Sequence, residues 1–475
     1  MLGASSGVVA EPRRGPVVIS EADPRKFMTA LAAAVAGDGE VFLGSPAWGA
    51  NERAQLKEHL SLNGPSAVPQ VCSAISAPSA PSGLSASVSQ SENRGQTPGG
   101  QQPATARSQI SQPAASGWLM IPTGGTSGRL KFARHDEETL AAAVGGFSRH
   151  FGLAQVNAAG VLPLHHVSGL MAWLRCALTG GEYRPLDWKA VEGGDLPVLP
   201  AKPAGWTISL VPTQLERLLN CRAGSPHPAS GASLGHEARR DAEIPPYNQT
   251  AVEWLRQFRI IFLGGGPAWP ALLDRAAAAG LPLSLGYGMT ETAAMVTALR
   301  PEEFLAGARN CGTALPHATV RIGADNTIII GGDSLFRGYH PAWRDRGDFE
   351  TQDHGLIDER NRLFVLGRRD AVIITGGEKV EPAELEAVLR GTGQFPDLVV
   401  LGLPDARWGQ LLVVVYPGNA HPNFHEVIRA TNHLADYKRP KRYIPLVGAW
   451  PATGQGKVNR AGLVERVAAQ LKERR

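Results

Sequence analysis

The chain has 475 residues, enough for two or three domains, and its 43% hydrophobic and 19% charged residues are typical of a globular protein. Its 47 basic and 43 acidic residues leave a formal net charge of +4, which is too small to indicate a nucleic-acid-binding protein. The four cysteines form no CxxC pair and no apolar run is long enough to cross a bilayer, so we expect no zinc site, no disulfide framework, no membrane span and a cytoplasmic location.

The N-terminal stretch alternates short strands with helices. Asp23 before Pro24 is typical of a helix N-cap followed by proline in the first turn. We expect strands at residues 17–19 and 40–44, and helices at residues 24–36 and 51–60.

Two later stretches have a different composition. Residues 63–116 are dominated by Ser, Pro, Gln, Gly and Ala and contain no aromatic residue, and residues 222–247 are rich in Gly, Pro and Ser. Such segments bury too little apolar surface to offset the entropy lost on ordering. We therefore predict a disordered insertion at 63–116 and an exposed loop at 222–247.

The stretch WLMIPTGGTSGRLK, residues 118–131, is the first that suggests chemistry. An apolar run at 118–121 predicts a buried strand, and a loop of Gly, Thr and Ser ending at Lys131 follows it. Glycines let backbone N–H groups approach a ligand, and successive N–H groups can form an anion-binding concavity. The spacing is not the Walker pattern. Taken alone, the stretch is equally compatible with a surface loop.

Strands and helices continue to alternate from residue 137 to residue 285. This alternation predicts βαβ units and mostly parallel sheets, in which ligands bind at the carboxyl ends of the strands. Glycine clusters at 124–128, 264–266 and 286–288 are each expected to follow a strand, so we expect them to face one site. The predicted helices are 137–151, 168–178, 213–220, 252–258 and one ending at 279, and the predicted strands are 161–166, 206–211, 260–263 and 281–285.

Beyond residue 296, short strands at 320–322, 327–330 and 363–366 indicate a small β subdomain. From residue 370 onward, about a hundred residues of mixed helix and strand can form an independent domain. We predict an α/β protein with a large N-terminal domain of βαβ sheets at 1–369 and a small, mobile α+β domain at 370–475. The helices expected in the latter are 382–389, 424–434 and a final helix, and its strands include 398–401 and 411–416.

Five separated motifs give this chain a resemblance to the acyl-adenylate-forming superfamily of acyl-CoA synthetases, adenylation domains and luciferases. Leu130 stands where the family usually has proline, and Gln352 where it commonly has glycine. The resemblance covers most of residues 118–460. The motifs are TGGTSGRLK at 123–131, LPLHHVSGL at 162–170, GYGMTET at 286–292, the run from TQDHG to AELE at 351–386, and PATGQGKVNR at 451–460.

The resemblance implies an enzyme that uses ATP, Mg²⁺ and coenzyme A in two half-reactions. A carboxylic acid and MgATP give an acyl-adenylate, the small domain swings, and a thiol then displaces AMP. The implied catalytic residues are Lys457, which binds the carboxylate and the α-phosphate, Thr290 at the α-phosphate, Glu291 as the Mg²⁺ ligand, and His166. The implied nucleotide-binding residues are Thr123, Gly124, Gly125, Thr126, Ser127, Gly128, Lys131, Gly264, Gly265, Gly266, Gly286, Tyr287, Gly288, Asp353 and Arg368.

The side chains suit these roles physically. The ring of Tyr287 offers a stacking surface for adenine, Asp353 can accept both ribose hydroxyls, and Arg368 is a fork donor for ribose or phosphate oxygens. Glu291 offers the hard oxygen that Mg²⁺ prefers. Each also has an ordinary interpretation, as a turn aromatic, a surface acid or a surface ion pair, and Lys457 taken alone is one exposed lysine among many.

The C-terminal part carries the residues implied in the second half-reaction. Asp370 aligns with the family hinge, although a simple turn aspartate is the alternative. Small residues next to Ile374 and Glu378 would line a tunnel for the pantetheine arm, namely Thr375, Gly376 and Gly377. A basic cluster suits coenzyme A phosphates and is equally compatible with a solvated turn: Lys438, Arg439, Lys441 and Arg442.

Three segments look most like the o-succinylbenzoate–CoA ligases of menaquinone and phylloquinone synthesis: 162–170, 209–219 and 263–267. His166 then aligns near the acyl pocket, with a core histidine as the alternative. Another acyl- or aryl-acid–CoA ligase and a stand-alone adenylation domain serving a carrier protein remain open. A non-enzymatic ATP-binding module is a further alternative, against which the presence of Glu291 and Lys457 argues. The expected partners are a small carboxylic acid, ATP and CoA, without nucleic acid, and the oligomeric state, including a homo-oligomer, is open.

Overall fold

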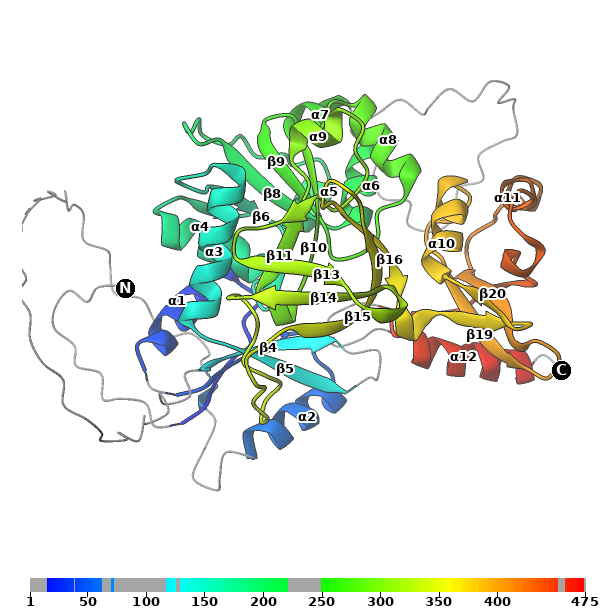
Figure 1. The fold of residues 1–475 in the computed structure, drawn as a ribbon, viewed down its shortest axis with the longest axis horizontal. Coiled ribbons are helices and arrows are strands. Elements are labelled where there is room, and N and C mark those ends of the chain that lie inside the picture. Colours follow the sequence, from blue (N-terminus) through cyan, green and yellow to red (C-terminus); the bar gives the residue numbers. More distant parts are fainter. Residues whose placement is uncertain are drawn as a thin grey trace, which may run out of the picture.

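The structure, a computed structural model, describes residues 15–37, 39–61, 70–71, 117–124, 129–220, 249–451 and 458–473. Its sheets and helices confirm a mixed α/β fold (Figure 1). The exposed loop predicted at 222–247 lies outside the described residues. The insertion predicted at 63–116 does so too, except for the strand β3 at Gln70–Val71, which pairs with β1.

The first sheet has the order β3-β1-β2-β4-β5. Its first four strands are parallel, and β4 and β5 are antiparallel. The helix α1 begins after Asp23, whose carboxylate accepts the N–H groups of Arg25 and Lys26 and so confirms the predicted cap. The elements are β1 (Val17–Ile19), α1 (Pro24–Val35), β2 (Val41–Leu43), α2 (Ala50–Ser61), β4 (Leu119–Gly124) and β5 (Leu130–His135).

The strand predicted at 118–121 is part of a β-hairpin that the sequence did not indicate. Strand β4 extends to Gly124 and pairs with β5, so that Thr123 lies opposite Lys131. Strand β5 was missed because polar residues are buried in it. Arg134 and His135 are 4% and 0% exposed, and each contacts a residue far away in the chain, Glu40 and Thr290 respectively.

The second sheet has the order β12-β11-β10-β9-β8-β6-β7, parallel from β7 to β10 and antiparallel beyond. Helices α3 and α4 pack against both sheets, because they contribute to one apolar core with β1, β2 and β4 and to another with β9 and β11. The elements are α3 (Glu137–Phe151), β6 (Ala158–Gly160), α4 (Val167–Thr179), β7 (Tyr183–Pro185), α5 (Trp188–Glu192), β8 (Trp206–Leu210), α6 (Pro212–Asn220), α7 (Gln249–Leu255), β9 (Phe258–Leu263), α8 (Pro270–Ala278), β10 (Leu283–Met289), η1 (Thr290–Thr292), β11 (Ala294–Ala298), α9 (Pro301–Leu305) and β12 (Thr313–Ala314).

Three predicted boundaries in this region were wrong. The strand expected at 161–166 lies at Ala158–Gly160 instead, because the chain turns after Pro163, whose carbonyl accepts the N–H of His166. The helix expected at 252–258 ends at Leu255. Residues 286–288 do not follow a strand but form part of β10, where they pair with β11.

A four-stranded antiparallel sheet confirms the small β subdomain, and its strand β15 was not predicted. A five-stranded sheet follows, with one apolar core on each of its faces. The elements are β13 (Ala318–Ile322), η2 (Ala324–Asn326), β14 (Thr327–Gly332), β15 (Phe349–Ile357), β16 (Leu363–Arg368), η3 (Arg369–Ala371), β17 (Ile373–Thr375), β18 (Glu378–Val380), α10 (Pro382–Gly391), β19 (Val399–Asp405), β20 (Gly409–Pro417), α11 (Phe424–Thr431), η4 (Asp436–Lys438), β21 (Arg442–Leu446) and α12 (Arg460–Glu473).

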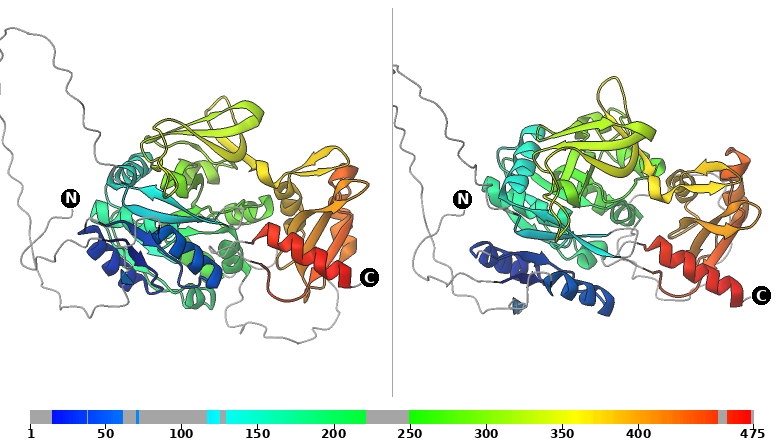
Figure 2. Two further views of the ribbon diagram at one scale, coloured as in Figure 1. Left: turned by 90° about the horizontal axis from the view of Figure 1, so that it is seen from below. Right: turned by 60° about the horizontal axis from the view of Figure 1, so that its bottom comes forward.

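The elements from β17 onward lie together at one side of the molecule in all views (Figures 1 and 2). They contact the larger part through α10. Arg390 stacks over the ring of Trp269 at 5.7 Å, and Glu381 Oε1 lies 3.7 Å from His354 Nδ1. The domain boundary at residue 370 stays a prediction. In the described part of the chain, no helix is long and apolar enough to cross a membrane.

Candidate active site

The strand β10 and the turn η1 that follows it carry the centre of the candidate site. Gly288 lies so close to Ala294 that a Cβ atom there would collide with the Ala294 carbonyl. Gly286 is similarly restricted by the backbone of Thr297, 2.9 Å from an ideal Cβ. The glycines of this motif are therefore required for packing of β10 on β11, and they set the position of Tyr287 between them.

Tyr287 belongs to a buried polar group at one end of this segment. Its hydroxyl donates to Asp353 Oδ2 at 2.6 Å, and the two residues are 9% and 8% exposed. Arg368 pairs with Asp353 in the register of β15 and β16, with Nη1 3.6 Å from Oδ1. Burial, together with the charge of Asp353, raises the pKa of Tyr287, so its hydroxyl remains a donor. Three predicted nucleotide-binding residues from separate motifs thus lie together.

Glu291 forms a second polar group at the other end. It is 8% exposed, and its Oε1 atom accepts a hydrogen bond of 2.6 Å from the hydroxyl of Tyr339. The ammonium group of Lys131 lies 5.2 Å from the centre of the Tyr339 ring. The structure therefore brings Lys131 and Glu291 to the same side chain. Tyr339 was not among the predicted site residues, because its only signal in the sequence is an aromatic residue following Gly338.

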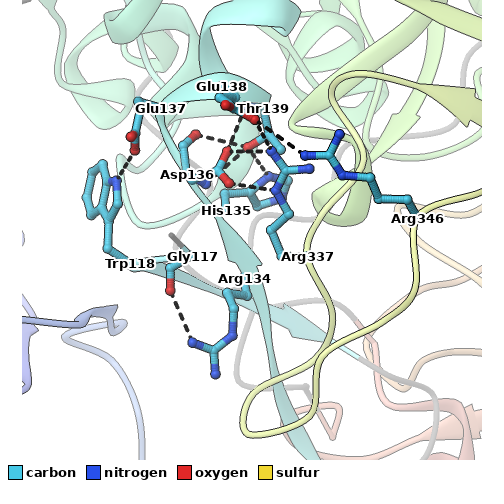
Figure 3. A network of polar contacts seen from close by, with 10 residues as sticks. All are labelled: Gly117, Trp118, Arg134, His135, Asp136, Glu137, Glu138, Thr139, Arg337 and Arg346. Atoms are coloured by element: carbon cyan, nitrogen blue, oxygen red, sulfur yellow. Dashed lines mark hydrogen bonds and ion pairs between the residues drawn. The ribbon is translucent and has the colours of Figure 1, made fainter. Parts of the chain in front are cut away.

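A network of polar residues surrounds the end of β5 and the start of α3 (Figure 3). Asp136 caps α3 and accepts a 2.6 Å hydrogen bond from Arg337 Nε. Burial opposes ionisation of Asp136, but the Arg337 guanidinium and the Thr139 N–H group lower its pKa. The ion pair joins the N-cap of α3, directly after β5, to the segment that carries Tyr339.

His135 links the same network to Thr290. Its Nε2 atom lies 2.8 Å from the Thr290 carbonyl oxygen, and its Nδ1 atom 3.1 Å from Thr139 Oγ1. Burial lowers the pKa of His135 to about 4, so the imidazole is neutral at pH 7. A carbonyl can only accept, so Nε2 carries the proton and Nδ1 accepts from the threonine hydroxyl. The ring thereby holds the backbone next to Glu291.

The remaining predicted glycines border this region. Strand β9 ends at Leu263, which pairs with Leu285 of β10. Gly264 and Gly286 are the next residues after this pair. An added Cβ at Gly264 or Gly266 would meet no atom within 4 Å, and Gly265 has a φ of +78°. Thr123 and Gly124 end β4. The other predicted loop residues and the catalytic lysine lie outside the described residues: Gly125, Thr126, Ser127, Gly128 and Lys457.

Helix α4 carries two further candidates. His166 is the residue before its first turn, with its ring 4.3 Å from that of His165. Arg175 lies on the same helix, only 5% exposed, with its guanidinium 3.9 Å from the centre of the Phe147 ring. The Nε atom of Arg175 has no hydrogen-bond partner, and the guanidinium group forms no ion pair with any described acid. Sequence analysis missed Arg175, although it is the one charged residue in an apolar helix.

The predicted hinge and tunnel residues lie at the start of the C-terminal elements. Arg368 donates to both oxygens of Asp370 at 2.7 and 2.8 Å. Thr375 ends β17, and the turn to β18 uses Gly376 and Gly377 with φ of +60° and +88°, a conformation that favours glycine. A Cβ at Gly376 would approach the ring of Trp408 to 3.0 Å.

The predicted basic cluster is partly neutralised. Lys438 pairs with Glu384 at 2.7 Å, and Arg439 with Asp436 at 2.8 Å. Lys441 instead lies over the ring of Trp408, 5.8 Å from its centre. The cluster therefore offers fewer unpaired charges than the sequence suggested.

Comparisons with known proteins identify the family of this chain. The sequence profile described as "AMP-binding enzyme" matches residues 18–340. A "2-succinylbenzoate--CoA ligase" of Listeria monocytogenes is 33% identical over 323 residues, 64% of this chain and 60% of the relative, so this chain spans about three fifths of that protein. A "Probable 2-succinylbenzoate--CoA ligase" of Mycobacterium tuberculosis is 30% identical over 364 residues, 74% of this chain and 85% of the relative.

Solved structures share the fold. The Bacillus subtilis o-succinylbenzoate CoA synthetase in complex with its acyl-adenylate intermediate superposes with a TM-score of 0.69 at 21% identity, covering 95% of this chain and 88% of that chain. ATP-bound MatB from Rhodopseudomonas palustris superposes with a TM-score of 0.66 at 20% identity, with 95% and 88% covered. At these identities the likeness concerns the fold alone.

Proposed function

The chain belongs to the AMP-binding enzyme family, and from that premise we propose that it activates a carboxylic acid with MgATP and transfers the acyl group to coenzyme A. One observation carries the proposal: Tyr287 with its partner Asp353 lies only four residues before Glu291 with its partner Tyr339. A nucleoside site and a phosphate site are thereby joined by one strand and its turn. This spacing suits one nucleotide bound along β10 and η1.

The nucleoside would lie at the Tyr287 end. Tyr287 offers its ring for stacking. Asp353 offers Oδ1, the carboxylate oxygen that does not accept the hydrogen bond from the Tyr287 hydroxyl. Ribose hydroxyls are suitable donors to this carboxylate, and Arg368 adds a cationic donor at the same edge. The triphosphate would then extend towards Thr290 and Lys131.

The residues at the other end fit a magnesium ion. Magnesium commonly binds one or two carboxylates and completes its coordination with phosphate oxygens and water. Glu291 supplies one carboxylate, whose Oε2 atom has no partner among the described residues. No cluster of three or more metal-binding side chains occurs in the described part of the chain, which suits an ion held largely by the nucleotide. The ion would neutralise phosphate charge when bound.

In the first half-reaction, a carboxylate oxygen of the acid forms a bond to the α-phosphorus, and the bond from that phosphorus to pyrophosphate breaks. Two anions must approach each other, so cationic groups lower the barrier. Lys131 and Lys457 are the proposed cations, and Thr290 is the proposed donor to an α-phosphate oxygen. In the second half-reaction, the thiol sulfur bonds to the acyl carbon, AMP leaves, and the thiol proton passes to solvent.

The proposed acceptor is coenzyme A, which the relatives' names also state. The turn at Gly376 and Gly377 presents no side chain that would block a pantetheine arm. Trp408, beside this turn, has Arg407 and Lys441 near its ring at 5.2 and 5.8 Å. An aromatic face between cations suits a nucleotide group.

The proposed acid is o-succinylbenzoate. The relatives above carry this acid in their names, whereas the fold does not select it, because MatB superposes almost as well. Arg175 supports an acid with a second carboxylate, since a buried cation without an acidic partner gains most from an anionic ligand. Another acyl- or aryl-acid remains the alternative.

The test is acid-dependent exchange of labelled pyrophosphate into ATP, with o-succinylbenzoate, benzoate and a medium-chain fatty acid compared. We expect exchange with o-succinylbenzoate, followed by CoA-dependent AMP release. Exchange with another acid alone would overturn the choice of acid, and no exchange with any acid would overturn the activity. If Arg175 binds the second carboxylate, Arg175→Met should reduce the exchange supported by o-succinylbenzoate more than the exchange supported by benzoate.

A further inference from the structure

We propose that Tyr339 is a positioning residue of the adenylation site, whose hydroxyl orients Glu291 and whose ring positions Lys131. The inference rests on the proposed function, because it takes Glu291 as the magnesium ligand and Lys131 as a phosphate-binding residue. It adds to that function a single side chain that holds both of them in one arrangement.

The contact with Glu291 leaves the carboxylate suited to a metal. Tyr339 occupies Oε1 at 2.6 Å, and Oε2 has no partner among the described residues. The donor is a neutral hydroxyl, so this contact places no positive charge beside the carboxylate, as a lysine or arginine partner would. One oxygen is oriented and the other remains for a cation.

The direction of the contact follows from its two groups. A carboxylate oxygen accepts, so the Tyr339 hydroxyl is the donor to Glu291.

The ring of Tyr339 acts on Lys131. The ammonium group lies 5.2 Å from the ring centre, within the range of a cation–π interaction. Lys131 forms no ion pair with any acid in the described ranges, so no carboxylate offsets its charge. The ring orients the lysine without neutralising it, which a phosphate-binding cation requires.

The backbone around Tyr339 is attached to both partners' segments. Tyr339 forms a β-bridge with Ala133, two residues after Lys131 on β5. On the other side, the N–H of Phe336 donates to the Glu291 carbonyl oxygen at 2.9 Å. These bonds fix where the side chain can reach, so the contacts with Lys131 and Glu291 do not depend on a mobile loop.

The test measures Mn²⁺ binding in the presence of ATP by electron paramagnetic resonance, which needs no turnover. In Tyr339→Phe we expect the Mn²⁺ dissociation constant to rise about tenfold, because a hydrogen bond to a charged group is lost. Tyr339→Leu should in addition weaken ATP binding about threefold through loss of the ring. Tyr416→Phe, which removes a hydroxyl from a buried tyrosine of the C-terminal sheet, is the matched control and should change neither.

A double-mutant cycle separates positioning from a general structural role. In a Glu291→Gln background, Tyr339→Phe should have no further effect on Mn²⁺ affinity, whereas a folding defect would persist there. A persistent effect, or an unchanged Mn²⁺ affinity in Tyr339→Phe, would overturn the inference while acid-dependent pyrophosphate exchange by the wild type still supported the proposed function. A wild type that binds no Mn²⁺ with ATP would overturn both.

Discussion

The two ends of the candidate nucleotide site differ in how firmly they are built. At the phosphate end, the supporting carboxylate of Asp136 is fully buried and its partner Arg337 is 20% exposed. At the nucleoside end, the Arg368 side chain is 45% exposed and contacts both Asp353 and Asp370. Buried, fully bonded groups resist rearrangement, whereas an exposed arginine between two acids can exchange partners at small cost. The proposed phosphate end is thus the more rigid of the two, and the proposed nucleoside end adjoins the predicted hinge.

The largest effect is expected at Lys457, the lysine of the C-terminal part that is predicted to act at the phosphate end. Lys457→Ala should slow adenylation by about a thousandfold, because the charge that offsets repulsion in the transition state is lost. Thioester formation from supplied acyl-adenylate should stay within about twofold of the wild type, since Lys457 is assigned to the first step only. Measuring both half-reactions separately checks this, and equal losses in the two would contradict the assignment.

Substitutions at the two ends should have separable effects. Glu291→Gln should raise the Mg²⁺ concentration needed for pyrophosphate exchange about tenfold, because a charged ligand is lost. Asp353→Asn should instead raise the KM for ATP by a similar factor of about ten and leave the Mg²⁺ requirement unchanged. Titrations of Mg²⁺ and ATP on both variants give the comparison. If the two variants respond alike, the division into a phosphate end and a nucleoside end is wrong.

The stability of the protein should also depend on pH, through His135 beside the phosphate end. Burial lowers the pKa of His135 to about 4, whereas the unfolded imidazole titrates near pH 6.5. The unfolded state therefore binds more protons between these values, so stability falls as the pH is lowered from about 6.5 to 4, by up to about 3 kcal/mol from this group. Urea unfolding at pH 7 and pH 5 measures the loss.

His135→Gln should reduce that pH dependence, because glutamine can still donate to Thr290 but does not titrate. Four other buried histidines have lowered pKa values and act in the same direction, so part of the dependence should remain: His150, His165, His317 and His340. Substituting the exposed His425 by glutamine serves as the control. A His135→Gln variant as acid-sensitive as this control would argue against a buried neutral imidazole.

The smallest effect is expected at Asp370, the predicted hinge residue beside the nucleoside end. Asp370→Asn should change the free energy of unfolding by less than about 1 kcal/mol, because its partner Arg368 is well exposed. If Asp370 serves as the hinge, thioester formation should slow several-fold more than adenylation. Single-turnover rates of both steps check this, and equal rates to the wild type in both would remove the hinge assignment.

Local signals in the sequence were sufficient for several of the helices. The helix at Glu137–Phe151 was predicted with its observed bounds, because Asp136 caps its start and Gly152 ends it in the left-handed conformation. The strand β5 was not predicted, because its buried Arg134 depends on an ion pair of 2.7 Å with Glu40, which lies far earlier in the chain. Such compensation by a distant residue leaves no periodic pattern.

The sequence by itself determined the family, the types of residue at the site and most of the alternating helices and strands, because capping residues and motifs act over a few neighbouring positions. Only the tertiary structure decided which of those residues meet. Tyr287 and Asp353 are 66 residues apart, and Glu291 and Tyr339 are 48 apart, yet each pair shares a 2.6 Å hydrogen bond. Pairings at such separations depend on how the sheets pack, and no local rule on propensity or spacing encodes them.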